Sequence, residues 1–294
     1  MLAAVPNVSE GRDPGVVRAI ADAFATRAIL LDVHSDADHN RSVFTLAGND
    51  EAIVESLLAG IAAAVALVDL REHTGVHPRV GVADVVPLVP LAPDDMRRAI
   101  AAARTLARRV GSELGLPVFH YAELGAGRRP AFFRRGGLDE LRRRIEASEL
   151  VPDDGPRRID PRAGAVLVGA RALLVAYNVD LATDDVGVAR EIAAVIRESS
   201  GGLAGVQAIG LVLPRSGRVQ VSMNVIDVER APLHEVVLRV RDEAAARGVE
   251  VRAGELIGLV PASVTRAAAA VGAEIPGVDE SRVLENVLRS RLAE

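Results

Sequence analysis

The sequence predicts an α+β fold made of two βαββαβ units related by internal duplication. Strand-like apolar runs and helix-like periodicity alternate along the chain, with turn signals between them. The same order of elements occurs twice, and the first strands of the two units end alike, in "AVPNVSE" and "VAYNVDL". The chain has 294 residues, 49% of them hydrophobic, so it can bury a sizeable core.

Turn-forming residues such as Gly, Pro, Asp and Asn separate many of the predicted elements. The first unit comprises a strand at 3–8, a helix at 14–25, strands at 28–34 and 41–47, a helix at 50–68 and a strand at 80–89. A helix at 94–114, a strand at 117–121 and an arginine-rich helix at 138–145 follow. The second unit comprises a strand at 172–178, a helix at 184–199, strands at 207–214 and 218–225, a helix at 233–247 and a strand at 249–255. We expect two domains, residues 1–165 and 166–294.

Composition excludes several classes of chemistry. The chain has no cysteine, which excludes disulfides and thiolate nucleophiles. It has no lysine either, because all 35 basic residues are arginine, and this excludes Schiff-base and P-loop lysines. The net charge of −5 argues against a nucleic-acid partner, and arginine clusters such as "RRPAFFRR" are either solvated faces or sites for anionic small molecules. We find no membrane-spanning run and no signal peptide, so we expect a cytoplasmic protein.

The stretch "REHTGVHPRVGVADVVPLVP" places two histidines before a buried strand. His73 and His77 are four residues apart, but Gly75 lies between them and Pro78 disfavours a helical conformation at His77. These residues argue against a helical metal pair, and an irregular loop is predicted instead. A histidine at a strand entrance can act as a general base near neutral pH, or it can be a structural surface residue.

A second cluster, "HSDADHNRSVF", contains two histidines and two aspartates within six residues. It partly matches the histidine- and aspartate-rich runs of metal hydrolases, but Ser35 and Asp36 stand where a second histidine is needed. A polar turn between two strands, with Asn40 and Arg41 directed at an anionic group, explains the same residues without a metal.

Two further features point to a ligand site. The Pro-, Gly- and Arg-rich segment "GPRRIDPRAG" is either a linker between domains or a rigid cationic loop that binds carboxylates. Asn7 and Asn178 lie at the end of the first predicted strand of each unit, where they either support turns or face a cleft between the two halves.

Six segments, in this order, resemble the formiminotransferase family along almost the whole chain: "VPNVSEG", "DHNRSVFTLAG", "HPRVGVADVVPLVPL", "GARALLVAYNVDL", "VQVSMNVID" and "ELIGLVP". The resemblance implies two ferredoxin-like subdomains with a ligand tunnel between them. It implies transfer of a formimidoyl group between 5-formimidoyltetrahydrofolate and L-glutamate in histidine degradation. The tetrahydrofolate derivative is a co-substrate, and no metal is required. The family's cyclodeaminase region has no counterpart here, so the implied partners are folate, glutamate, a second copy in a homodimer and a separate cyclodeaminase.

The resemblance also implies roles for particular residues. His77 in "HPRVG" falls on the family's catalytic histidine, and Asp36 is a candidate for its acidic partner. Side-chain chemistry, and not the resemblance, makes Arg41 and Arg79 candidates for binding glutamate carboxylates, because a planar bidentate donor fits a carboxylate. In the same way, Asn7, Asn40 and Asn178 are candidates for the pterin edge or the formimidoyl nitrogen. The segment expected to line the folate site consists of Gly155, Pro156, Arg157, Arg158, Ile159, Asp160, Pro161, Arg162, Ala163 and Gly164.

Three alternatives remain open from the sequence. A formyltransferase would use the same residues, because the transferred groups differ by one heteroatom. A non-catalytic sensor of folate or amino acids is compatible with the predicted fold. A metal-dependent hydrolase would be built on His34, Asp36, Asp38, His39 and His77.

Overall fold

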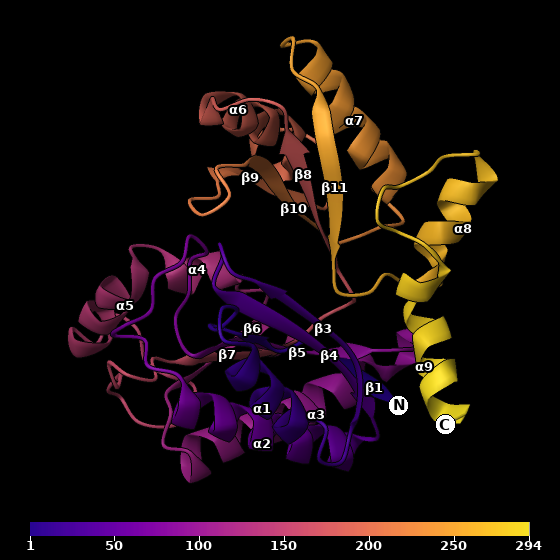
Figure 1. Ribbon diagram of the computed structural model, residues 1–294. Coiled ribbons are helices and arrows are strands. Elements are labelled where there is room, and N and C mark those ends of the chain that lie inside the picture. The colour runs from indigo at the N-terminus through magenta and orange to yellow at the C-terminus, as the bar shows by residue number, and fades with distance from the viewer. Residues whose placement is uncertain (294) are drawn as a thin grey trace. The chain divides into compact units, whose positions relative to one another are not determined.

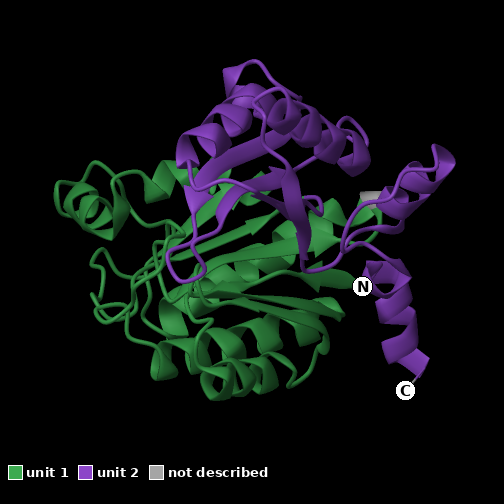
Figure 2. Cartoon of the chain, turned by 45° about the horizontal axis from the view of Figure 1, so that its top comes forward, with its two compact units in different colours: residues 1–171 green, residues 172–294 purple. Residues whose placement is uncertain are grey.

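The computed structural model describes residues 1–293, apart from the side chain of Pro93. These residues form two compact units, Met1–Arg171 and the chain from Ala172 onward, which Figure 2 shows in green and purple. Each unit combines sheet and helices around a hydrophobic core of its own, which confirms the predicted α+β class. The units are described separately below.

Unit 1 is built on a mixed sheet (Figure 1). Its strands within the described residues are β1 (Leu2–Ala4), β2 (Asn7–Val8), β3 (Ile29–Asp36), β4 (Arg41–Gly48), β5 (Ala83–Pro90), β6 (Val118–Ala122) and β7 (Val166–Ala170). β1 and β2 follow one another between β4 and β5, and Pro6, which lacks an N–H, separates them. β3 extends the sheet beyond β4, and β7 and then β6 extend it beyond β5 in parallel.

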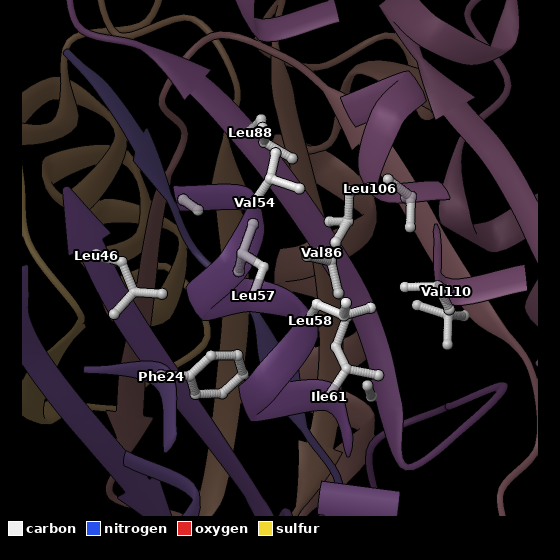
Figure 3. Packing of buried hydrophobic residues seen from close by; sticks show 14 of the residues in the cluster. Phe24, Leu46, Val54, Leu57, Leu58, Ile61, Val86, Leu88, Leu106 and Val110 are labelled. Atoms are coloured by element: carbon white, nitrogen blue, oxygen red, sulfur yellow. The ribbon is translucent and has the colours of Figure 1, made fainter. Parts of the chain in front are cut away.

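Helices cover both faces of this sheet. Caps at Asp13 and Asn49, which accept backbone N–H bonds, start the first two long helices. α1 (Pro14–Phe24), α2 (Asp50–Leu67) and α3 (Met96–Glu113) pack on one face, where Figure 3 shows their apolar side chains meeting those of β4 and β5. α4 (Pro130–Arg134) and α5 (Gly137–Glu146) belong to a separate cluster with alternate residues of β6 and β7. The short helices η1 (Pro93–Asp95) and η2 (Glu123–Gly125) lie in the connections.

A close helix contact depends on Gly60. A Cβ there would lie 2.0 Å from Phe24 Cδ1, so only glycine lets α2 approach the Phe24 ring. The ring also lies 5.0 Å, centroid to centroid, from that of Phe44 on β4. Phe24 thus joins α1, α2 and the sheet in one core.

Unit 2 contains an antiparallel sheet with the strand order β11, β8, β10, β9. The strands are β8 (Val175–Leu181), β9 (Val206–Val212), β10 (Val219–Val225) and β11 (Val251–Ile257), and α6 (Val186–Ile196) and α7 (Leu233–Ala245) connect them. Alternate residues of β8, namely Val175, Tyr177, Val179 and Leu181, join the core beneath these helices. The remaining helices are η3 (Glu198–Ser200), α8 (Ala262–Ala270), η4 (Glu280–Arg282) and α9 (Leu284–Ala293).

Most predicted elements are present, with shifted ends. The strand predicted at 80–89 begins only at Ala83, and the one predicted at 172–178 is β8, three residues later. The sequence analysis did not predict β7, α4, α8 or α9. Unit 1 extends six residues beyond the predicted boundary at 165, because β7 pairs with β5 and β6. Among the described residues, no helix combines the length and apolar composition needed to cross a membrane.

Candidate active site

The centre of the polar site in unit 1 is Asp84, the second residue of β5, whose side chain is fully buried. Its Oδ2 accepts from Arg41 Nη1 at 2.7 Å and from Arg134 Nη2, and its Oδ1 accepts from the Val80 N–H at 2.8 Å. Burial would raise the pKa of Asp84, but the charges of Arg134 and Arg41 hold that pKa well below its usual range. One ionised carboxylate therefore ties the start of β4, the end of α4 and the segment before β5 together.

Arg41, the first residue of β4, is nearly as buried as Asp84. Its Nε donates to Asn7 Oδ1 at 3.0 Å, and Asn7 Nδ2 in turn donates to the Val5 carbonyl at 2.8 Å. Burial lowers the pKa of Arg41 to about 10, helped by the charge of Arg134 and opposed by that of Asp84. The structure thus brings together two of the residues predicted for substrate binding, Asn7 and Arg41.

His77 lies in the loop between α2 and β5, and its residue as a whole is half-buried. Its Nδ1 is buried and makes no hydrogen bond to any described residue. Burial places the pKa of His77 well below its usual range, and the charges of Arg41 and Arg134 lower this pKa further, against the opposing effect of Asp84. The imidazole is therefore neutral at pH 7, and its Nδ1 has no hydrogen-bond partner among the described residues.

The turn between β3 and β4 provides a second histidine beside this one. The ring centroids of His39 and His77 lie 6.2 Å apart. Asp36 Oδ1 lies 3.0 Å from His39 Nδ1 and accepts the His39 N–H at 2.7 Å. Burial raises the pKa of Asp36, but these bonds to His39 outweigh it and lower the pKa to about 2. Asp36, the candidate acidic partner of His77, is therefore paired with His39.

Asn40 and Arg79 shape the loop that carries His77. Asn40, with a left-handed φ of 47°, accepts from the Gly11 N–H at 3.0 Å and donates to the Thr74 carbonyl at 3.1 Å. Arg79 Nη2 donates to the carbonyls of Gly75 and His77 at 2.9 and 2.8 Å. The amide of Asn40 and this nitrogen of Arg79, both predicted to bind substrate, thus hold backbone of the loop.

The predicted folate segment approaches this loop at one end. Gly81 and Gly164 form a β-bridge, and the Ala165 N–H donates to the Val80 carbonyl at 2.9 Å. A Cβ on Gly164, whose φ is +76°, would lie 2.4 Å from that carbonyl, so this approach requires glycine. At the other end, Arg157 and Arg158 are exposed.

The structure gives Arg162 a contact to helix backbone and places Asn178 inside a strand. Arg162 Nη2 donates to the Ala66 carbonyl at 2.9 Å, which attaches the folate segment to the end of α2. Asn178 was predicted at the end of a strand, and this was wrong: it is the fourth residue of β8, opposite Ser222 and Glu255. It belongs to unit 2.

The sequence analysis missed Asp84 and Arg134. Asp84 is the one charged residue in the apolar run "VGVADVVPLVP", and a charge at the start of a buried strand was the available signal. Arg134 lies in a cluster for which both a solvated face and an anion site were open, and its side chain is only 16% exposed. No group of three or more His, Cys, Asp or Glu side chains within residues 1–293 is arranged as a metal-ligand set.

Comparison with known proteins agrees with the resemblance noted in the sequence. Residues 1–171 match the N-terminal subdomain of the formiminotransferase domain, and residues 176–274 match the formiminotransferase domain. A glutamate formimidoyltransferase of Thermoplasma acidophilum is 40% identical, covering 96% of this chain and 95% of that protein. One of Streptococcus pyogenes is 37% identical, covering 97% of each.

Fused relatives match over part of their length only. A formimidoyltransferase-cyclodeaminase of Gallus gallus is 38% identical over 87% of this chain, but the match covers 49% of that protein. The matches to the two domain descriptions extend over most of the chain, and the two unfused relatives match almost end to end. This chain therefore belongs to the formiminotransferase family.

Proposed function

We propose that this chain is a glutamate formimidoyltransferase, which moves a formimidoyl group between 5-formimidoyltetrahydrofolate and L-glutamate in histidine degradation. Family membership and the two end-to-end relatives with this name support the activity. The observation that carries the site is His77, a neutral imidazole with an unpartnered nitrogen beside a buried cationic cluster.

The reaction requires one proton to move between two amines. His77 takes a proton from the glutamate α-ammonium, and the free amine forms a bond to the amidine carbon. The tetrahedral intermediate then collapses: the bond from carbon to folate N5 breaks, and the proton on His77 passes to N5. A positioned base contributes about 10²- to 10⁴-fold to such a rate, and holding both substrates in place adds more. Neither a covalent intermediate on the enzyme nor a lysine is needed.

The folate site is the segment from Gly155 to Gly164. Two observations support this placement. Its C-terminal end is hydrogen-bonded to the strand entrance four residues after His77, through the bridge between Gly81 and Gly164. Its exposed arginines, Arg157 and Arg158, are available to the carboxylates of a glutamylated folate. In this arrangement the pterin is directed toward His77 and the glutamyl tail toward the arginines.

The finer architecture belongs to the same proposal. Both units contain the element order βαββαβ, and the strand order of unit 2 is that of a split βαβ sheet. We therefore take the halves as ferredoxin-like subdomains, divided near residue 171, where unit 1 ends. The family resemblance alone supports four further parts of the proposal: the ligand tunnel, the homodimer, the cytoplasmic location and a separate cyclodeaminase partner. The proposed substrate-binding role of Asn178 depends on the tunnel.

The test is a spectrophotometric assay with tetrahydrofolate and N-formimidoyl-L-glutamate, run beside N-formyl-L-glutamate. His77→Gln is expected to lose about 10²- to 10⁴-fold in kcat while tetrahydrofolate still binds. His234→Gln on α7 of unit 2 is the matched histidine control and should retain full activity. Full activity in His77→Gln would refute the role of His77, and turnover of the formyl donor alone would identify a formyltransferase. Activity lost in chelator would point to the metal-dependent alternative.

A further inference from the structure

The cluster around Asp84 contains more positive charge than it can balance. Arg41 and Arg134 contribute two positive charges and Asp84 one negative charge, which leaves one positive charge beside the neutral His77. The three side chains are 10%, 16% and 0% exposed, so water screens this charge weakly. Buried charges in proteins are normally paired, and an unpaired one is costly.

Arg134 also has an unused donor. Its Nη2 donates to Asp84, but its buried Nε makes no hydrogen bond to any described residue. A guanidinium group presents its donors in a rigid planar fork that fits the two oxygens of a carboxylate. The surplus positive charge and the unused N–H donor therefore fit the same ligand, a carboxylate.

The chemistry of the proposed reaction identifies which carboxylate this is. In glutamate, the reacting nitrogen and the α-carboxylate are bonded to the same carbon, so the α-carboxylate must lie close to the base. The carboxylates of folate are separated from N5 by the whole p-aminobenzoyl spacer. The loop that carries His77 is bonded to the same carboxylate as the two arginines, because the Val80 N–H, three residues after His77, donates to Asp84 Oδ1 at 2.8 Å. The two arginines are therefore at the reacting end of the substrates.

We propose, on the basis of the function proposed above, that Arg134 and Arg41, both held by Asp84, bind the α-carboxylate of the amino-acid substrate. Arg134 takes the place that sequence reasoning gave to Arg79, whose Nη2 is bonded to the loop backbone. Asp84 is then a positioning residue, because it fixes the two guanidinium groups and does not touch the substrate.

This arrangement couples substrate binding to the basicity of His77. The same two positive charges that receive the carboxylate disfavour protonation of the imidazole. A bound α-carboxylate neutralises the surplus charge and so raises the pKa of His77. The imidazole thus becomes a better base when the α-ammonium of the same substrate has to be deprotonated. When water or a ligand without a carboxylate occupies the site, the pKa of His77 stays low.

The experiment compares Arg134→Gln with Arg135→Gln, its exposed neighbour in sequence, which serves as the matched control. In Arg134→Gln, Arg41 and Asp84 remain as a one-to-one pair, so this variant is expected to fold. Each enzyme is assayed with N-formimidoyl-L-glutamate, with its α-carboxamide and with its γ-carboxamide. We expect Arg134→Gln to raise KM for N-formimidoyl-L-glutamate by about 10- to 100-fold and Arg135→Gln to leave it unchanged.

The assays with the carboxamides form a double-mutant cycle, in which one change is Arg134→Gln in the enzyme and the other is loss of a carboxylate from the substrate. The wild type should disfavour the α-carboxamide strongly, and Arg134→Gln should lose most of that preference. The proposal is overturned if Arg134→Gln discriminates against the α-carboxamide as the wild type does, or if the γ-carboxamide is the one whose penalty disappears.

Binding measurements separate this inference from the proposed function. If the wild type transfers no formimidoyl group, the function fails, but calorimetric titration with L-glutamate still tests the carboxylate site. Binding to the wild type and to Arg135→Gln, with loss in Arg134→Gln, supports the site. Equal binding of L-glutamate to all three proteins overturns the proposal. The proposal is also overturned if Arg134→Gln loses tetrahydrofolate binding but keeps glutamate binding, because the bound carboxylate would then belong to folate.

Discussion

Each unit contains an aspartate that is bound by an arginine, but the two networks differ in charge balance. In unit 2, Asp180 on β8 accepts from Arg218 Nη1 at 2.6 Å and from the neutral amide of Gln220 at 2.9 Å. In unit 1, Asp84 is shared by two guanidinium groups. The Arg218 side chain is 36% exposed, whereas that of Arg41 is 10% exposed. One guanidinium group is thus bonded to Asp180 and two are bonded to Asp84, and more buried positive charge than one carboxylate offsets is the feature that marks unit 1 as the candidate ligand site.

The largest difference is expected from removing the carboxylate in each network. Asp84→Asn leaves two buried guanidinium groups without a counter-charge, so it should lower the free energy of unfolding by about 3–5 kcal/mol. Asp180→Asn removes a partner from a more exposed arginine and should cost about 1 kcal/mol. Urea unfolding of both variants, followed by circular dichroism, measures this. Equal losses would show that the surplus charge of unit 1 is not a special feature.

The acid dependence of stability should expose the His77 site. The pKa of His77 is depressed in the folded chain, so the unfolded chain binds a proton first as the pH falls below about 6.5. Stability is then lost with decreasing pH, by at most about 1.4 kcal/mol per pH unit for this one proton. Urea unfolding between pH 7 and 5 should show this slope in the wild type and a shallower slope in His77→Gln. Identical slopes in the two proteins would exclude a buried neutral His77.

Asp36 contributes with the same sign at lower pH. Its folded pKa of about 2 lies below the ordinary value of 3.8, so its stabilisation is lost as the pH falls through that interval. The carboxylate and the histidine therefore act in separate pH windows. Burial also lowers the pKa of His73, so the comparison with His77→Gln is what isolates the share of His77 above pH 5.

The smallest effect on stability is expected from Arg134→Gln. It leaves one arginine per carboxylate, as in unit 2, so it should change the free energy of unfolding by less than about 1 kcal/mol. It should nonetheless raise the pKa of His77, because a positive charge next to the imidazole is removed. NMR titration of the histidine Cε1–H signals, with His77→Gln for assignment, checks this. Arg218→Gln in unit 2 is the control, and an unchanged His77 signal in Arg134→Gln would contradict the charge coupling.

Local sequence patterns were sufficient for most of the secondary structure and for part of the site. Alternating apolar residues and capping residues such as Asp13 and Asn49 act over a few neighbours, so the strands and helices could be predicted to within a few residues. The loop conformation at His77 followed from Gly75 and Pro78. The missed strand β7 is short and wholly buried, with no polar alternation to mark it.

The rest of the site depends on contacts between distant segments. Arg134 is fifty residues from Asp84 in sequence, and nothing near it in "RRPAFFRR" distinguishes it from Arg135. Arg79 has the same fork of donors as Arg41, but only the folded loop shows that its Nη2 holds the backbone at Gly75 and His77. The catalytic role of His77 and the folate role of residues 155–164 remain predictions.

By itself, the sequence determined the α+β class, the family and the histidine at the strand entrance, because periodicity, turn residues and motifs are properties of neighbouring residues. The tertiary structure decided which charges share a site. Asp84 joins β5 to β4 and α4, and this pairing arises only when the sheet and the helices pack. Packing also removes the water that would otherwise screen these charges, and the resulting surplus at His77 is therefore a property of the fold.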